Sequence, residues 1–171
     1  MNSTNPLWWL TLLLCLLCTN NALALSGDRD QPMTLEADSV SIDEGTGVSL
    51  YEGNVVITQG SLKLWADRLW IHRREGKTEK LISEGAPTRF RQLTDEQQEV
   101  KGQALRAEFY VDRDELLLFD EAVLEQGADR FRSDRIVYNR ANAQVRAGAS
   151  AEGKQRVQVI IEPRQTSETT P

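Results

Sequence analysis

Residues 51–72 read Tyr51-Glu-Gly-Asn-Val-Val-Ile-Thr-Gln-Gly-Ser-Leu-Lys-Leu-Trp-Ala-Asp-Arg-Leu-Trp-Ile-His72. This stretch predicts two strands joined by a turn at 59–61, because β-branched and aromatic residues alternate with polar ones and glycine marks the turn. In the second strand the inward-facing series is Leu62, Leu64, Ala66, Leu69 and Ile71, and its step from Ala66 to Leu69 is three residues instead of two. A strand that keeps one face buried across such a step needs a bulge or a bend.

The kinked strand recurs along the chain as an apolar-x-small-polar-x-apolar pattern. Its four copies lie at 35–40, 64–69, 100–105 and 131–136, and in the third copy Ala107-Glu108 offers a competing register. A second element alternates with it, usually with glycine at its centre, and occurs at 51–55, 83–87, 119–123 and 146–150. Glu121 takes the place of glycine in its third copy. A repeat of roughly 30 residues indicates stacked units that share one core. We therefore expect an all-β protein whose strands fold over together into a jelly-roll-like or solenoidal sandwich.

The chain has 171 residues, which corresponds to one domain, expected at 25–162. Residues 1–24 carry no charge and contain an apolar run at 7–18, followed by Ala22-Leu23-Ala24. This pattern is typical of a secretory signal peptide cleaved after Ala24. Cleavage would remove Cys15 and Cys18, the only two cysteines, so the exported domain would be stable without a disulfide. The residue before each cysteine is leucine, which favours cleavage over lipidation. The polar segment 163–171 is expected to be disordered.

Composition and motifs argue against several functions. A net charge of −6 argues against a general nucleic-acid binder. Gly76-Lys77-Thr78 resembles the end of a phosphate-binding loop, but Ile71 stands where that loop needs glycine, and we interpret it as a hairpin turn. His72 is the only histidine, and no nucleophile motif accompanies it. No catalytic constellation, metal site or cofactor site is expected.

Two pairs of carboxylates and one pair of tryptophans each have a structural and a functional interpretation. Asp28/Asp30 and Asp112/Asp114 could serve a hydrolase, but their polar surroundings favour solvated turn charges. Trp65 and Trp70 fall on the outward face of their strand, and cross-strand packing is favoured there over a partner-binding surface.

Apolar residues that face inward in the repeats would line one continuous interior. On composition alone a packed core is favoured over a ligand-binding groove. These residues are Met33, Leu35, Val40, Ile42, Leu50, Val55, Ile57, Leu64, Leu69, Ile71, Phe90, Leu105, Leu116, Leu118, Phe131 and Ile136.

The sequence resembles the OstA-like family of lipopolysaccharide-export proteins. The resemblance rests on Asp30-Gln-Pro-Met-Thr-Leu-Glu-Ala-Asp38, on the run 51–62 and on Ala66-Asp67, and it extends over residues 28–162. It implies a twisted, partly open β jelly roll whose two sheets hold lipid acyl chains in an apolar groove. It also implies a non-enzymatic periplasmic carrier of lipopolysaccharide from the inner to the outer membrane, for which Arg73 and Lys80 could contact lipid phosphates. The alternative is a structural β scaffold of the cell envelope with a filled core.

An open stack of strands leaves one free edge at each end. The first edge strand is expected at 33–42 and the last at 156–161, with Pro32 and Pro163 just outside them. Two different edges that fit each other would produce head-to-tail self-association by strand addition. The family resemblance implies the inner-membrane subunit LptC at the N-terminal edge and the outer-membrane subunit LptD at the C-terminal edge. The docking residues would be Met33, Leu35, Val40, Val157, Val159 and Ile161.

Overall fold

The structure is a computed structural model, and it describes residues 28, 31–94 and 96–161. The predicted signal peptide at 1–24 and the predicted disordered tail at 163–171 lie outside the described residues. Within the described ranges no helix is long and apolar enough to cross a membrane.

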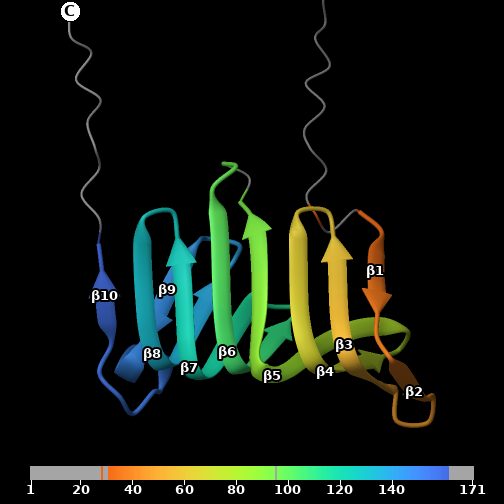
Figure 1. Ribbon diagram of the computed structural model, residues 1–171. Helices are drawn as coiled ribbons and strands as arrows, with labels where there is room; N and C mark the ends of the chain where they lie inside the picture. The colour runs from red at the N-terminus through yellow and green to blue at the C-terminus, as the bar shows by residue number, and fades with distance from the viewer. Residues whose placement is uncertain (1–27, 29–30, 95, 162–171) are drawn as a thin grey trace, which may run out of the picture.

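The described chain forms one open antiparallel sheet in which long neighbouring strands follow one another in sequence (Figure 1). The long strands are β3 (Val48–Gln59), β4 (Leu62–Arg74), β5 (Lys77–Leu93), β6 (Glu99–Tyr110), β7 (Glu115–Gln126) and β8 (Asp129–Asn139). The short strands β1 (Met33–Glu36) and β2 (Ser39–Asp43) pair with β3. At the other end β9 (Gln144–Ala147) and β10 (Gln158–Ile160) pair with β8, and the 3₁₀ helix η3 (Gly148–Ala151) follows β9.

All pairs of adjacent long strands shift register at a common level, which confirms the predicted kink, and the β4–β5 pair shifts a second time between His72 and Arg73. The first shift in the β4–β5 pair falls between Trp65 and Arg68, where the sequence breaks its alternation. The β3–β4, β5–β6, β6–β7 and β7–β8 pairs shift at the matching level. Because the bends coincide, the sheet doubles back on itself, and the two halves of each long strand lie in different layers (Figure 1).

The bends use unusual backbone conformations. In β3 the bulge contains Gly53 and Asn54, with φ of 79° and 46°. The Asp38 side chain lies against Gly53, where a β-carbon would collide with it, and it accepts a hydrogen bond from Asn54 Nδ2 at 2.9 Å. In β7 the bulge contains Asp120 and Glu121, with φ of 59° and 53°. Glu121 therefore adopts a conformation that favours the glycine it replaces in the repeat.

Two residues predicted to face inward do not, and two more lie on the inner face but are exposed at the edge of the sheet. Leu50 pairs with Trp70, and directly paired residues share a face of the sheet. Because Trp70 is next to the buried Leu69 in the strand, Leu50 lies on the outer face, away from Leu69. Val40 and Ile42 pair with Tyr51 and Ser49, which places them on the face of Leu69 and Ile71, but on the edge strand β2 they are 54% and 57% exposed. Leu105 is 39% exposed because the bulge in β6 turns Ala104 and Ala107 inward in its place. The pairing of β6 with β7 is otherwise regular, so the third repeat is a full strand pair.

Replacing Glu121 with Gly should stabilise the protein. A left-handed conformation costs a residue with a β-carbon roughly 1–2 kcal/mol, and the added chain entropy of glycine offsets roughly 0.5–1 kcal/mol of the relief. The Glu121 side chain is exposed, so no packing is lost. Urea unfolding followed by circular dichroism should show a gain of roughly 0.5–1 kcal/mol for Glu121→Gly and none for Glu121→Ala. If Glu121→Gly and Glu121→Ala changed the free energy of unfolding equally, the backbone of this bulge would not be strained.

Candidate ligand-binding groove

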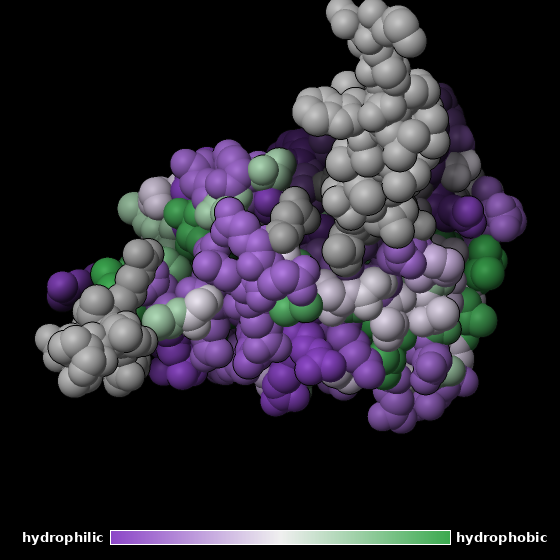
Figure 2. All heavy atoms as spheres, turned by 90° about the horizontal axis from the view of Figure 1, so that it is seen from above, coloured by the Kyte–Doolittle hydropathy of each residue, from purple (hydrophilic) through white to green (hydrophobic). Residues whose placement is uncertain are grey.

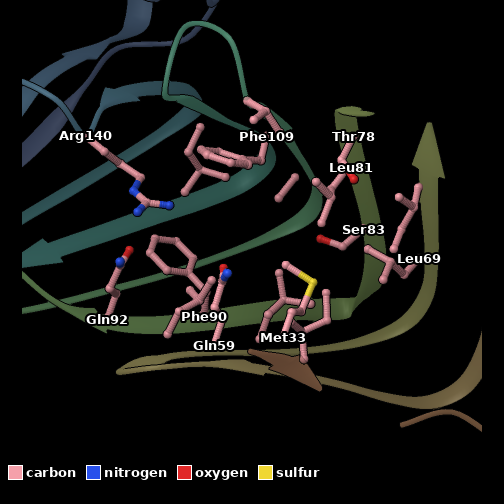
Figure 3. Close-up of a pocket in the computed structure, with 17 residues that line it drawn as sticks. Met33, Gln59, Leu69, Thr78, Leu81, Ser83, Phe90, Gln92, Phe109 and Arg140 are labelled. Carbon is pink, nitrogen blue, oxygen red and sulfur yellow. The ribbon is translucent and has the colours of Figure 1, made fainter. Parts of the chain in front are cut away.

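The inner faces of the two layers enclose a groove of about 280 Å³ in the N-terminal half of the molecule. Side chains from both layers form its walls (Figure 3). Its lining consists of Met33, Ile57, Gln59, Leu62, Leu64, Leu69, Ile71, Thr78, Leu81, Ser83, Phe90, Gln92, Ala107, Phe109, Val111, Leu116 and Arg140. Most of these side chains are apolar, so the groove is suited to an apolar ligand.

Polar groups gather toward one side of the groove. Figure 3 shows Arg140, Gln92 and Gln59 on one side, and Leu69 with Leu81 on the other. Gln59 and Gln92 lie at the ends of β3 and β5, whereas Arg140 directly follows β8 in the other layer. The groove thus has an apolar floor and a polar mouth that both layers supply. This is the arrangement that an amphiphile requires.

The C-terminal half of the interior is packed. Its core consists of Phe90, Val100, Ala104, Ala107, Leu116, Leu118, Ala122, Leu124, Ile136 and Tyr138. Phe90 belongs to this core and also lines the groove. Its ring lies directly over Gly102, where a β-carbon would collide with it. Phe90 therefore lies where the groove meets the packed core, as do Ala107 and Leu116.

The structure divides the predicted inward series into three groups. Those that line the groove are Met33, Ile57, Leu64, Leu69, Ile71, Phe90 and Leu116. Those that pack in the core without lining the groove are Leu35, Val55, Leu118, Phe131 and Ile136. The remaining four neither line the groove nor pack in the core: Leu50 and Leu105 face outward, and Val40 and Ile42 are exposed on the edge strand β2.

Arg140 is a groove residue that the sequence reading missed. It extends the inward parity of Ile136 and Tyr138 by two residues, a signal that was available in the sequence. Its Nε lies 3.5 Å from Asp114 Oδ1, and its guanidinium lies 5.1 Å from the centre of the Phe109 ring. Asp114 is thus paired, and the prediction that it is a solvated charge is wrong. Asp112 is 72% exposed, as predicted.

Asp28 is also not a solvated turn charge, and its predicted companion Asp30 lies outside the described residues. The Asp28 carboxylate accepts hydrogen bonds from Ser61 N at 2.7 Å, Ser61 Oγ at 2.6 Å and Gln92 Nε2 at 2.8 Å. Burial alone would raise the pKa of this carboxyl. The hydrogen bonds from Ser61 and Gln92, together with the positive charge of Arg140, outweigh burial and lower the pKa below its ordinary value of 3.8.

The two predicted phosphate contacts lie on different faces. Arg73 is exposed and pairs with Thr78, which lines the groove, so the two residues share a face. Lys80 follows the opposite parity to Leu81 and lies on the outer face. Its Nζ is 3.8 Å from Glu108 Oε2 and 5.3 Å from the centre of the Tyr110 ring. Of the two, only Arg73 is on the groove side.

The remaining sequence candidates occupy structural positions. Gly76 lies in the hairpin turn between β4 and β5, as predicted. His72 pairs with Lys80 near the end of β4. Trp65 lies on the outer face beside Lys63 and Arg91, whose cationic groups are 5.6 and 5.8 Å from the centre of its ring. Trp70 lies beneath Arg68 at 5.5 Å.

Fold and groove together define a class of protein: an open β jelly roll with an apolar interior site. Residues 34–144 match the family model described as LptA/(LptD N-terminal domain) LPS transport protein. The chain is 33% identical over 155 residues to lipopolysaccharide export system protein LptH of Pseudomonas aeruginosa, covering 86% of this chain and 88% of that protein. It is 33% identical over 146 residues to lipopolysaccharide export system protein LptA of Escherichia coli (strain K12), covering 84% and 78%.

A solved structure agrees with these relatives. The crystal structure of LptH from Pseudomonas aeruginosa, the LptA homologous periplasmic component of the lipopolysaccharide transport device, matches with a TM-score of 0.72 and 30% identity. The match covers 80% of this chain and 99% of that chain. The chain therefore belongs to the LptA family and is a non-enzymatic, periplasmic component of lipopolysaccharide transport. The family, fold class and compartment predicted from the sequence are confirmed.

Replacing Asp28 with Asn should destabilise the protein by about 1–2 kcal/mol at neutral pH, because the three hydrogen bonds lose their charged acceptor. The folded-state pKa of Asp28 lies below 3.8, so its stabilisation is complete above that pH and disappears as the pH falls through the lower folded value. Urea unfolding of the unmodified protein and of Asp28→Asn should show that the difference in their free energies of unfolding disappears as the pH is lowered. Asp112→Asn, at an exposed site, should show no such difference. A difference in stability that stays unchanged at acid pH would contradict the role of the Asp28 negative charge.

Proposed function

We propose that this chain binds lipopolysaccharide by its acyl chains and passes it from the inner toward the outer membrane. The observation that carries the proposal is the largely apolar groove between the two layers, with Arg140, Gln59 and Gln92 gathered at its mouth. Such a site can bury part of an acyl chain and leave sugars and phosphates in water. Arg73, exposed on the groove side, is the better placed of the two predicted phosphate contacts.

The size of the groove suits transfer. Burying an acyl chain contributes about 0.8 kcal/mol per CH₂, so one fully buried 12-carbon chain would contribute on the order of 10 kcal/mol. A carrier that buried several chains completely would release its ligand too slowly. The groove of about 280 Å³ lies just below the range of roughly 300–1,000 Å³ for ligand sites, and it borders the packed core at Phe90. Partial burial is therefore expected, with affinity low enough for release.

The edges of the sheet suit head-to-tail assembly. Neither β1 and β2 at one edge nor β9 and β10 at the other closes the sheet. Figure 2 shows hydrophobic residues at both ends of a largely hydrophilic surface. The exposed apolar side chains at the edges are Met33, Val40, Ile42, Val157, Val159, Ile160 and Ile161. Exposed apolar edges of this kind favour strand addition. We assign the N-terminal edge to LptC, the C-terminal edge to LptD, and both to further copies of this chain.

The second candidate is a structural β scaffold of the envelope without a lipid ligand. The packed C-terminal half favours it, because a filled core needs no ligand. The hollow N-terminal half favours the carrier.

Photo-crosslinking distinguishes these two functions. A photoreactive residue at Leu64, Ile71 or Phe109 should capture lipopolysaccharide, because these side chains line the groove. Trp65, the neighbour of Leu64 on the opposite face, and the exposed Leu105 serve as matched controls and should give little product. Capture at equal yield from both sets would show that the groove is not the binding site.

Replacing Val159 with Pro should abolish concentration-dependent self-association and docking to LptD. Proline removes a backbone donor from the centre of β10. Val159→Thr keeps the donor and the branched side chain, so sedimentation should show it associating like the unmodified protein. Crosslinking of lipid at Leu64 should persist in both variants. A Val159→Pro protein that docks normally would exclude this edge as the joint.

A further inference from the structure

Three hydrogen-bond donors converge at the mouth of the groove. The backbone N–H and hydroxyl of Ser61 and the side-chain amide of Gln92 all point to the Asp28 carboxylate. We call these three donors the oxyanion cradle. The Ser61 hydroxyl is oriented before any anion binds, because its oxygen accepts a hydrogen bond from Leu93 N at 3.0 Å. Its own proton is therefore directed at the anion.

The turn that carries Ser61 is shaped for close approach of an anion. Gly60 has a φ of 57°, and a β-carbon there would collide with the Asp28 carboxylate. The carboxylate thus lies against bare backbone. Consecutive backbone groups in such a turn form a concave site that binds anions.

The cradle adjoins the groove. Gln92 belongs to both, and Arg140, which reaches the mouth from the other layer, lowers the pKa of the Asp28 carboxyl by its positive charge. An oxyanion held here would lie between the two layers, next to the apolar floor. The natural occupant of such a paired site is a molecule with an anionic group joined to an acyl chain.

We propose that the oxyanion cradle of Ser61 and Gln92, flanked by Arg140, is a binding site for a phosphate group of the transported amphiphile, and that Asp28 competes with that phosphate for it. The proposal rests on the proposed function, because it uses the groove for the acyl chain. Two anions repel each other at this distance, so the phosphate and the Asp28 carboxylate exclude each other. Each gains charge-assisted hydrogen bonds from the same donors. The competition lowers the net affinity for the phosphate and so favours release.

Removing the competitor tests the proposal. Isothermal titration calorimetry compares dodecyl phosphate, dodecyl maltoside and inorganic phosphate, with the two dodecyl compounds below their micelle-forming concentrations. Asp28→Ala should bind dodecyl phosphate about tenfold more tightly than the unmodified protein, as expected for freed charge-assisted hydrogen bonds. Its affinity for dodecyl maltoside should be unchanged. Adding Gln92→Ala should abolish the selective gain, measured as the ratio of the two dodecyl affinities.

The control variant is Asp38→Ala, which removes a carboxylate bonded to Asn54 away from the groove, and it should leave the ratio unchanged. If circular dichroism shows Asp28→Ala to be unfolded, Asp28→Asn replaces it, with a gain in the same direction. If Asp28→Ala gained no affinity for dodecyl phosphate, or gained as much for dodecyl maltoside, the cradle would not be a phosphate site, although the groove could still bind the acyl chain. Inorganic phosphate binding as tightly as dodecyl phosphate would overturn the assignment to an amphiphile. Failure of both dodecyl compounds to bind the unmodified protein would overturn the groove itself and the cradle with it.

Discussion

Alignment of the backbone bends across the sheet is the constraint on which the rest of the structure depends. Every pair of adjacent long strands shifts register at a common level, so each bend lies beside a bend in the neighbouring strand. A single misplaced bend would reverse the faces of all residues beyond it. The backbone accepts unfavourable conformations at Asn54, Asp120 and Glu121 to keep this alignment. The result is one sheet whose inner face is folded against itself.

The folded sheet accounts for both parts of the interior. Where aromatic and branched side chains of β5–β8 meet, they fill the space between the layers. Toward β3 and β4 the side chains do not fill the space between the layers, and this space is the groove. Because the sheet is open, its two end strands remain available for pairing with other chains. Ligand binding and assembly therefore follow from the same architecture.

The sequence predicted the fold because its signals are periodic. The broken alternation at Ala66 and Leu69 marked the bend, and both residues are buried, as the predicted inward series requires. The sequence could not place Leu50 or Leu105, because the side they face depends on where their own strands, β3 and β6, bulge. Nor could it show which part of the apolar interior stays unfilled, since Phe90, which borders both the groove and the packed core, lies over Gly102 in an adjacent strand. The role of Asp28 depends on contacts with the β3–β4 turn and with β5 that are distant in sequence.

Contacts between the bound lipid and methyl groups of the two sheet faces can be measured directly by nuclear Overhauser effects in the protein–lipopolysaccharide complex. The account predicts that acyl-chain methylenes contact the methyl groups of Leu64, Ile71 and Leu81, which line the groove. It predicts no contact with Leu117 or Val137, which are buried in a separate cluster of the sheet. Contacts with both sets, or with neither, would contradict the claim that the folded sheet holds the lipid between its layers.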